Sequence, residues 1–157
     1  MTQVDFYILN QQGQHSRQTF ACRLAEKAYR LDKTVHIHTR NRADAERLDE
    51  LLWTFRDGSF VPHECLTGAG AAAESPITIG CDDDAVAPRD LLINLCDDIP
   101  GCAEAFPRVA ELVTSDDDCK QLSRRRFAAY REQGHTEPTH DAVSRAESSI
   151  HENRSRL

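Results

Sequence analysis

The chain has 157 residues, of which 39% are hydrophobic and 29% charged, and its formal net charge at pH 7 is -7. This length accommodates one domain with its own core, and the composition excludes a chain that is disordered throughout. The acidic balance argues against broad coating of DNA, which requires many basic side chains, and no apolar run approaches the roughly 18 to 20 residues that span a bilayer.

The first part of the chain alternates predicted strands and helices. Residues 4–9 are apolar enough for a strand that is buried on both faces. Apolar residues recur every three or four positions over 16–31, which predicts an amphipathic helix with Ser16 as its N-cap. Residues 34–39 alternate with period two and predict a second strand, and 42–53 predict a second helix. This order is typical of a doubly wound parallel sheet.

The second part supplies further strands, a basic helix and a polar tail. Extended or strand-like segments are predicted over 60–63, 76–80, 90–95 and 108–113, with a helical turn over 102–106. The basic helix covers 120–134. Residues 135–157 contain few large apolar side chains, so only a weak helix over 139–153 is allowed there. We therefore expect an α/β domain over 1–134 and a polar C-terminal tail over 135–157 that is mobile or ordered only by contacts.

The basic helix reverses the charge of the rest of the chain. Its cations, set against the single acid Glu132, are Lys120, Arg124, Arg125, Arg126 and Arg131. Helical spacing places Lys120, Arg124, Phe127 and Arg131 on one face, and we expect Leu122, Ala129 and Tyr130 to pack inward. The face is either simply solvated or forms a cationic groove with an apolar floor. Such a groove suits a peptide that carries carboxylates beside a hydrophobic residue.

Patterns for catalysis, metals and cofactors are weak. The turn over 10–15 has one glycine, and Gly68-Ala69-Gly70 lacks the third glycine of a phosphate-binding loop, so a flexible connection is favoured. His36 and His38 share a strand face and are interpreted as polar residues on a half-exposed strand, rather than as metal ligands with His63 or Cys65. Residues 116–118, all aspartates, are expected to cap the basic helix. We expect no catalytic residue, metal or cofactor.

The termini and cysteines indicate the compartment. The first six residues lack the basic and apolar regions of a secretory signal, so we expect a cytoplasmic protein. The six cysteines include no Cys-x-x-Cys pair. In a cytoplasmic chain this spacing favours free, mostly buried thiols over disulfides or a zinc site.

Aromatic residues concentrate in one segment, where Trp53, Phe55 and Phe60 lie within eight positions. They form either a local plug of the core or an exposed patch that binds another protein. Periodicity alone favours the core.

Several short sequence segments together resemble one known family, the chi subunit of bacterial DNA polymerase III. They are Phe6-Tyr7-Ile8-Leu9, Arg47-Leu48-Asp49-Glu50-Leu51-Leu52-Trp53, Ser59-Phe60-Val61-Pro62-His63, Arg89-Asp90-Leu91-Leu92-Ile93-Asn94-Leu95, and Lys120-Gln121-Leu122 followed by Arg124, Arg126, Phe127, Tyr130-Arg131 and Gly134. They occur in order from about residue 4 to 134. The segments around Trp53 and Phe60 are the most specific part of the resemblance.

The resemblance implies a Rossmann-like three-layer sandwich with a mostly parallel sheet and no catalytic site. It implies an accessory subunit of the clamp-loader complex in DNA replication, with indirect contact to DNA. Members bind the psi subunit through an apolar surface, here Trp53, Phe60 and Pro62. They bind the acidic C-terminal tail of single-stranded-DNA-binding protein in a basic pocket, whose residues here are Val113, Lys120, Arg124, Phe127, Tyr130 and Gly134. The resemblance also allows a repair helicase as a partner, and it raises the interface interpretation of the aromatic segment above the core one.

Two positions depart from the family. Phe127 stands where tyrosine is frequent, and Ala128 stands where a lysine is common, which implies a weaker pocket that still binds, with Arg125 as a substitute cation. Two other functions remain open on the residues alone. One is a small nucleotide-dependent enzyme on the same sheet, and the other is a direct binder of single-stranded nucleic acid.

Overall fold

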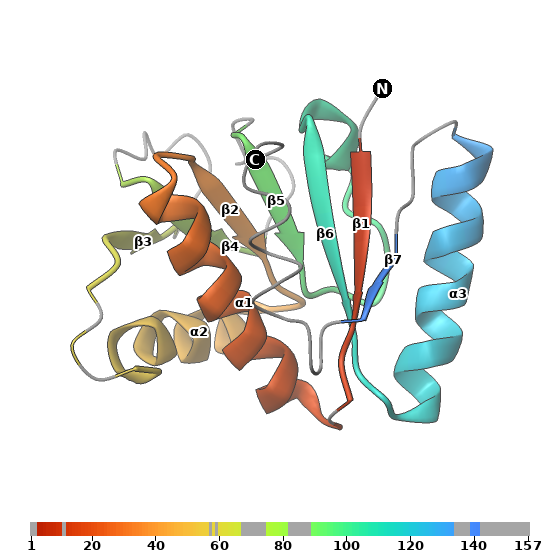
Figure 1. The fold of residues 1–157 in the computed structure, drawn as a ribbon, viewed down its shortest axis with the longest axis horizontal. Coiled ribbons are helices and arrows are strands. Elements are labelled where there is room, and N and C mark those ends of the chain that lie inside the picture. The colour runs from red at the N-terminus through yellow and green to blue at the C-terminus, as the bar shows by residue number, and fades with distance from the viewer. Residues whose placement is uncertain are drawn as a thin grey trace.

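The computed structural model describes residues 3–10, 12–56, 58, 60–66, 75–81 and 89–133, and the backbone of 139–141. Within these residues seven strands form one sheet in the order β3-β4-β2-β5-β6-β1-β7, and every strand pairing is parallel (Figure 1). The strands are β1 (Gln3–Ile8), β2 (Val35–His38), β3 (His63–Cys65), β4 (Ile77–Gly80), β5 (Leu91–Asn94), β6 (Arg108–Val113) and β7 (Thr139–Asp141). The helices are α1 (Gln14–Arg30), α2 (Arg42–Thr54) and α3 (Asp117–Glu132), with a 3-10 turn at Ala103–Ala105.

Helices cover both faces of the sheet, because successive side chains of a strand point to opposite faces. Tyr7 of β1 packs against Phe20 of α1, with ring centroids 5.5 Å apart. Its neighbour Phe6 packs on the other face against Phe127 of α3, at 5.3 Å. Two hydrophobic cores follow, one beneath α1 and α2 and one beneath α3 and the 3-10 turn. The expected three-layer α/β sandwich is confirmed.

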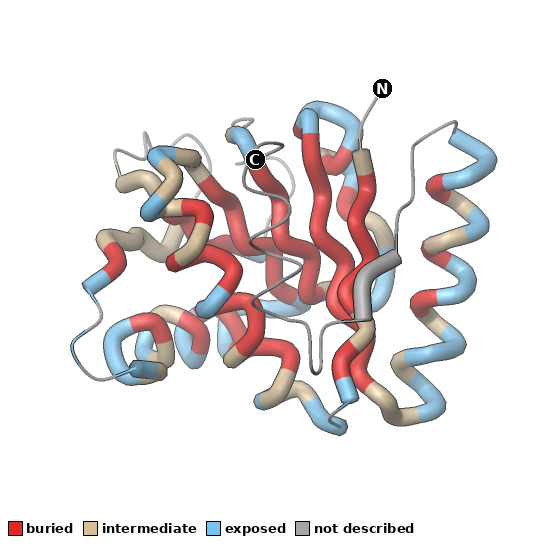
Figure 2. The backbone as a smooth tube through the Cα atoms, viewed as in Figure 1, coloured by how far each residue is buried: buried red, intermediate tan, exposed pale blue. Residues whose placement is uncertain are grey.

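The central strands are buried along their whole length, as Figure 2 shows in red. All residues of β2, β4, β5 and β6 are buried. This burial explains why 108–113 and 90–95 read as strands from composition alone, since a parallel strand covered on both faces needs a near-continuous apolar run. None of the described helices has the length and apolar character needed to cross a membrane.

The first helix begins earlier than predicted. Gly13 is its N-cap with a φ of 92°, and Ser16 lies inside the first turn, where its hydroxyl donates to the carbonyl of Gln12. The N-cap prediction for Ser16 is therefore wrong. Gly13 adopts the positive φ that other residues avoid, so the chain enters the helix there.

Two further segments differ from expectation. The extended segment over 60–63 enters the sheet only at His63, as β3. Thr139–Asp141 forms strand β7, where only a weak helix had been allowed. It pairs with the edge of β1, Phe6 opposite Thr139 and Ile8 opposite Asp141. An open sheet edge offers unpaired backbone groups, and no local pattern in the tail reveals that partner. The tail's other residues lie outside those described.

None of the six cysteines, all of which lie among the described residues, forms a disulfide, but only Cys22 is buried. Burial raises the pKa of its thiol to about 12. Cys81 is exposed and the other four are half-buried. The expectation of mostly buried thiols is wrong, because most of these cysteines lie in loops or at the ends of elements rather than at core positions.

Candidate functional site

A cavity of about 270 Å³ lies between α3 and the sheet, and we call it the α3 pocket. Phe6 and Ile8 of β1, Val113 of β6 and Phe127 of α3 provide its apolar surfaces. Lys120, Ser123 and Arg124 of α3 complete its lining. The arrangement combines an apolar floor with two cations, so it is the groove described above rather than a merely solvated helix face.

Strand alternation and helical spacing build the α3 pocket. Phe6 and Ile8 are two positions apart on β1 and face the same side of the sheet, and Ile8 pairs directly with Val113. On α3 the lining positions recur every three or four residues, which places them on one stripe. The guanidinium carbon of Arg131 lies 5.8 Å from the Phe127 ring centroid, within range of a cation–π contact.

The structure brings together four of the six residues expected in a peptide pocket. Val113, Lys120, Arg124 and Phe127 line the same cavity. Tyr130 lies beneath it, and Gly134 falls outside the described residues. Phe6, Ile8 and Ser123 were not anticipated. The alternation of Phe6 and Ile8 on one strand was visible, but only the tertiary structure places that strand under α3.

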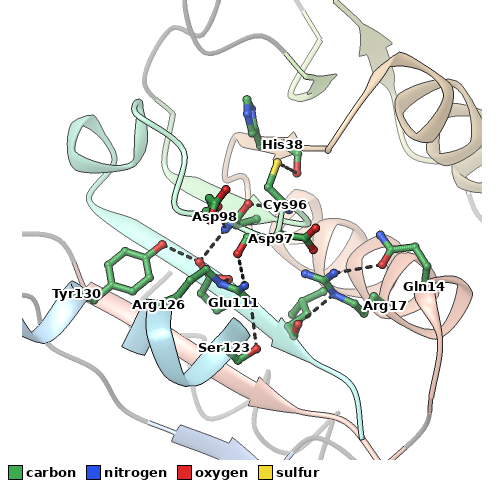
Figure 3. Close-up of polar contacts among 12 residues, drawn as sticks. Gln14, Arg17, His38, Cys96, Asp97, Asp98, Glu111, Ser123, Arg126 and Tyr130 are labelled. Atoms are coloured by element: carbon green, nitrogen blue, oxygen red, sulfur yellow. Dashed lines mark hydrogen bonds and ion pairs between the residues drawn. The ribbon is translucent and has the colours of Figure 1, made fainter. Parts of the chain in front are cut away.

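The inward face of α3 carries a charged residue that was not anticipated there. Arg126 is only 4% exposed. Its Nε donates to Glu111 Oε1 at 3.0 Å, its Nη1 to the carbonyl of Asp97 at 2.6 Å and its Nη2 to Ser123 Oγ at 3.0 Å (Figure 3). Leu122 and Ala129, expected to pack inward, are only half-buried. The buried stripe is therefore Ser123, Arg126 and Tyr130.

The carboxylate of Glu111 is the centre of this network. Tyr130 donates its hydroxyl to Glu111 Oε2 at 2.6 Å, and Asn94 Nδ2 donates to the same oxygen at 2.8 Å. Burial, followed by the negative charge of Glu111, raises the pKa of the Tyr130 hydroxyl. Tyr130 thus supports the α3 pocket from below. Arg126 is neutralised internally, whereas Lys120 and Arg124 form no ion pair within the described part of the chain.

The carboxyl edge of the sheet, where α/β proteins commonly bind nucleotides, carries a carboxylate of the protein itself. The chain leaves β1 toward α1 and leaves β6 toward α3, on opposite faces, so these adjacent strands form a topological switch point. There the N–H of Gly13, the N-cap of α1, donates to Asp116 Oδ1 at 3.3 Å. Asp116 is the N-cap residue of α3, as expected, but its side chain makes no capping bond to that helix.

Asp116 makes the stability of this edge dependent on pH. A hydrogen bond from Thr114, followed by backbone N–H groups including that of Gly13, lowers its pKa. A depressed pKa means that the ionised carboxylate stabilises the fold above the unfolded pKa of about 3.9, and that this contribution is lost as the pH falls through the folded pKa. We expect Asp116→Asn to cost no more than about 0.5 kcal/mol at pH 7, because Asp116 is only partly buried and solvent screens its charge.

Urea unfolding of wild type and Asp116→Asn at a series of pH values from 7 to 3 measures this effect. The difference between the two free energies of unfolding should shrink below about pH 5. A difference that stays constant over the whole range contradicts the assignment, because asparagine retains an acceptor and lacks only the titrating charge.

An aromatic surface lies at the β3 end of the sheet, away from the α3 pocket beside β1 and β6. We define this surface by Trp53, Phe60 and Pro62. Trp53 is 50% exposed and Phe60 66%, with ring centroids 5.6 Å apart, while Pro62 is half-buried. The core interpretation is therefore wrong for Trp53 and Phe60, although Phe55 does pack against the core. Trp53 follows the buried position Leu52 by one residue, a rotation of about 100° that turns it away from the sheet.

The paired histidines of β2 are structural. His36 and His38 are buried, not half-exposed, because β2 lies inside the sheet between β4 and β5. His36 Nδ1 lies 2.8 Å from the hydroxyl of Thr78, and burial lowers the pKa of the His36 ring to about 3. Among the residues that the structure describes, no three histidine, cysteine or acidic side chains gather in a way that could hold a metal ion.

Comparison with known proteins identifies the family of this chain. Residues 1–137 match the family model described as DNA polymerase III chi subunit, HolC. The chain belongs to this family. The chi family match spans both the α3 pocket and the aromatic surface, and it ends before β7 begins at Thr139.

Individual chi subunits are similar over most of their length. DNA polymerase III subunit chi of Pseudomonas aeruginosa is 42% identical over 135 residues, which cover 86% of this chain and 93% of that protein. The chi subunit of Escherichia coli is 34% identical over 139 residues, covering 85% and 94%. That of Haemophilus influenzae is 35% identical over 130 residues, covering 82% and 90%. The resemblance seen in the sequence is confirmed.

Proposed function

We propose that this protein is a non-catalytic accessory subunit of DNA polymerase III that links the psi subunit of the clamp loader to the acidic C-terminal tail of single-stranded-DNA-binding protein. Membership of the chi family supports the assignment to the polymerase. The observation that carries the finer function is the α3 pocket, with Lys120 and Arg124 beside an apolar cavity. Contact with DNA is then indirect, through the coated single strand.

The chemistry of the α3 pocket suits the end of an acidic peptide. Such a tail presents aspartates, a terminal apolar side chain and a free α-carboxylate. The apolar side chain enters between Phe6, Val113 and Phe127, where its burial is favourable. Arg124 holds a carboxylate with two parallel N–H donors, and Lys120 adds a point charge. Because Arg126 is committed to Glu111, these two exposed cations carry the recognition.

Arg131 compensates in part for the absent lysine at position 128. Ala128 is exposed and adds no charge. The guanidinium of Arg131 lies over the Phe127 ring, so it supplies a cation beside the apolar seat from one turn further along α3. This placement makes Arg131 a better substitute than Arg125.

Titration with a peptide that ends in Asp-Asp-Ile-Pro-Phe tests the pocket. Arg124→Ala should weaken binding by about tenfold or more, since a hydrogen bond to a charged group is worth about 1.5–3 kcal/mol. The matched control is Arg125→Ala, which removes the same exposed charge from a residue that does not line the cavity. It should change affinity by no more than about threefold, because an exposed ion pair contributes little.

The dependence of binding on salt is part of the same test. Affinity should fall as ionic strength rises, because the carboxylates and cations meet at the surface. No binding at low salt, or equal affinity of wild type and Arg124→Ala, overturns the pocket assignment. Binding of single-stranded DNA by the protein alone, lost steeply with salt, would instead support direct nucleic-acid contact.

The aromatic surface is the proposed site for psi. Trp53 and Phe60 are both exposed and in contact with each other, as expected for an anchor that another protein covers. It lies at the β3 end of the sheet, whereas the α3 pocket lies beside β1 and β6. Two partners can therefore bind at the same time without competing, which the linking function requires.

A further inference from the structure

Ser123 is the one buried polar residue among the described residues that line the α3 pocket. It is 5% exposed, whereas the two cations of the pocket, Lys120 and Arg124, are exposed. Phe127 follows Ser123 by one turn on the same face of α3, and it lines the cavity without a hydrogen-bonding group. The hydroxyl of Ser123 therefore lies beside the apolar floor and is more deeply enclosed than the two cations.

The hydroxyl of Ser123 has a proton to donate. Arg126 Nη2 donates to Ser123 Oγ at 3.0 Å (Figure 3). A hydroxyl carries one proton and two lone pairs, so an oxygen that accepts this bond can still act as a donor. No group in the part of the chain that the structure describes accepts that proton. The proton is therefore available to a ligand that enters the cavity.

We propose that Ser123 is a specificity-determining residue, which donates its hydroxyl to the free α-carboxylate at the end of the acidic peptide. The proposal rests on the proposed binding of such a peptide in the α3 pocket. The α-carboxylate is attached to the same carbon atom as the terminal side chain, so it enters together with that side chain and reaches the apolar floor. The aspartates precede it along the peptide and meet the exposed Lys120 and Arg124.

The network behind Ser123 favours a charged acceptor. Glu111 Oε1 at 3.0 Å and the carbonyl of Asp97 at 2.6 Å hold Arg126 in place, so its guanidinium acts on the pocket through the hydroxyl of Ser123. Successive hydrogen bonds polarise one another, and a hydroxyl that accepts from a guanidinium is therefore a stronger donor. Its bond to a carboxylate is stronger than its bond to a neutral amide. The pocket should thus discriminate a free carboxylate from an amide.

Two peptides that both end in Asp-Asp-Ile-Pro-Phe test this role, one with a free C-terminal carboxylate and one with a C-terminal amide. Wild type should bind the free acid about tenfold or more tightly than the amide at low salt, the effect of a hydrogen bond to a charged group. In Ser123→Ala this preference should shrink to about threefold or less. The free acid then loses a charge-assisted hydrogen bond, whereas the amide loses at most a neutral one.

Ser123→Thr is the matched control, because it keeps the hydroxyl and should retain most of the preference for the free acid. Ser123→Ala also leaves Arg126 Nη2 without its acceptor, so thermal unfolding shows whether each variant is folded. The ratio of the two affinities is measured on one preparation, and a loss of stability alone does not change it. If Ser123→Ala does not fold, Ser123→Cys replaces it, since a thiol is of similar size and only a weak donor.

The outcomes separate two failures. Equal affinity of wild type for the two peptides overturns the role of Ser123, and so does a preference in folded Ser123→Ala that is as large as in wild type. In both cases the peptide still binds, so the proposed function of the α3 pocket stands. If wild type binds neither peptide at low salt, the proposed function fails and the role of Ser123 fails with it.

Discussion

Arg126→Ala is expected to destabilise the fold by about 3–5 kcal/mol, the cost of removing one partner from a buried ion pair. The substitution leaves the carboxylate of Glu111, which is 0% exposed, without its cation. It also removes the donors to the carbonyl of Asp97 and the hydroxyl of Ser123. The free energy of unfolding in urea measures the loss, and few surface substitutions approach this size.

The neighbouring arginine provides the matched control. Arg125 is exposed, so Arg125→Ala should stay within about 0.5 kcal/mol of wild type. The double variant Glu111→Gln/Arg126→Met should recover part of the loss, because it removes the unpaired buried charge and keeps an acceptor for Tyr130 and Asn94. Equal stabilities of Arg125→Ala and Arg126→Ala would show that Arg126 is not buried against Glu111.

Trp53→Ala is expected to weaken binding to psi by about 2 kcal/mol or more, roughly thirtyfold, as for the aromatic anchor of an interface. The side chain is 50% exposed, so the isolated protein should lose little stability. Affinity for the acidic peptide should be unchanged, because the α3 pocket lies at the other end of the sheet. Co-purification with psi and peptide titration of the same preparation measure both effects.

Two further variants make this test specific. Phe60→Ala should behave like Trp53→Ala, since the two rings are in contact. Leu52→Ala, one position away, removes a buried side chain and should cost about 2–5 kcal/mol of stability. If Trp53→Ala and Phe60→Ala both bind psi as wild type does, the interface lies elsewhere on the protein.

The periodicity of apolar residues in the sequence predicted most of the helices and strands. The strand over 108–113 matches β6 in full, and 42–53 matches α2 to within one residue, because strands covered on both faces are continuously apolar and a surface helix carries an apolar stripe. The spacing along α3 likewise placed Lys120, Arg124 and Phe127 on one face, and the structure puts all three in one pocket. Local errors came at helix starts, where Gly13 rather than Ser16 decides the boundary.

The basic helix, by contrast, could not be divided into buried and exposed charges from its sequence. Arg124, Arg125 and Arg126 are identical residues in one run, yet within the part of the chain that the structure describes only Arg126 meets a buried carboxylate. That carboxylate is 15 residues away on β6. The pairing of β7 with β1 and the bond from Gly13 to Asp116 are equally remote in sequence.

The amino-acid sequence by itself determined the order of strands and helices as far as α3, the chi family and the cationic face of α3, because each of these is carried by local spacing or by short sequence motifs. Only the tertiary structure decided that Arg126 is internal and that Trp53 and Phe60 are exposed. The physical reason is that burial, ion pairing and protonation depend on which distant groups the fold brings within a few ångströms.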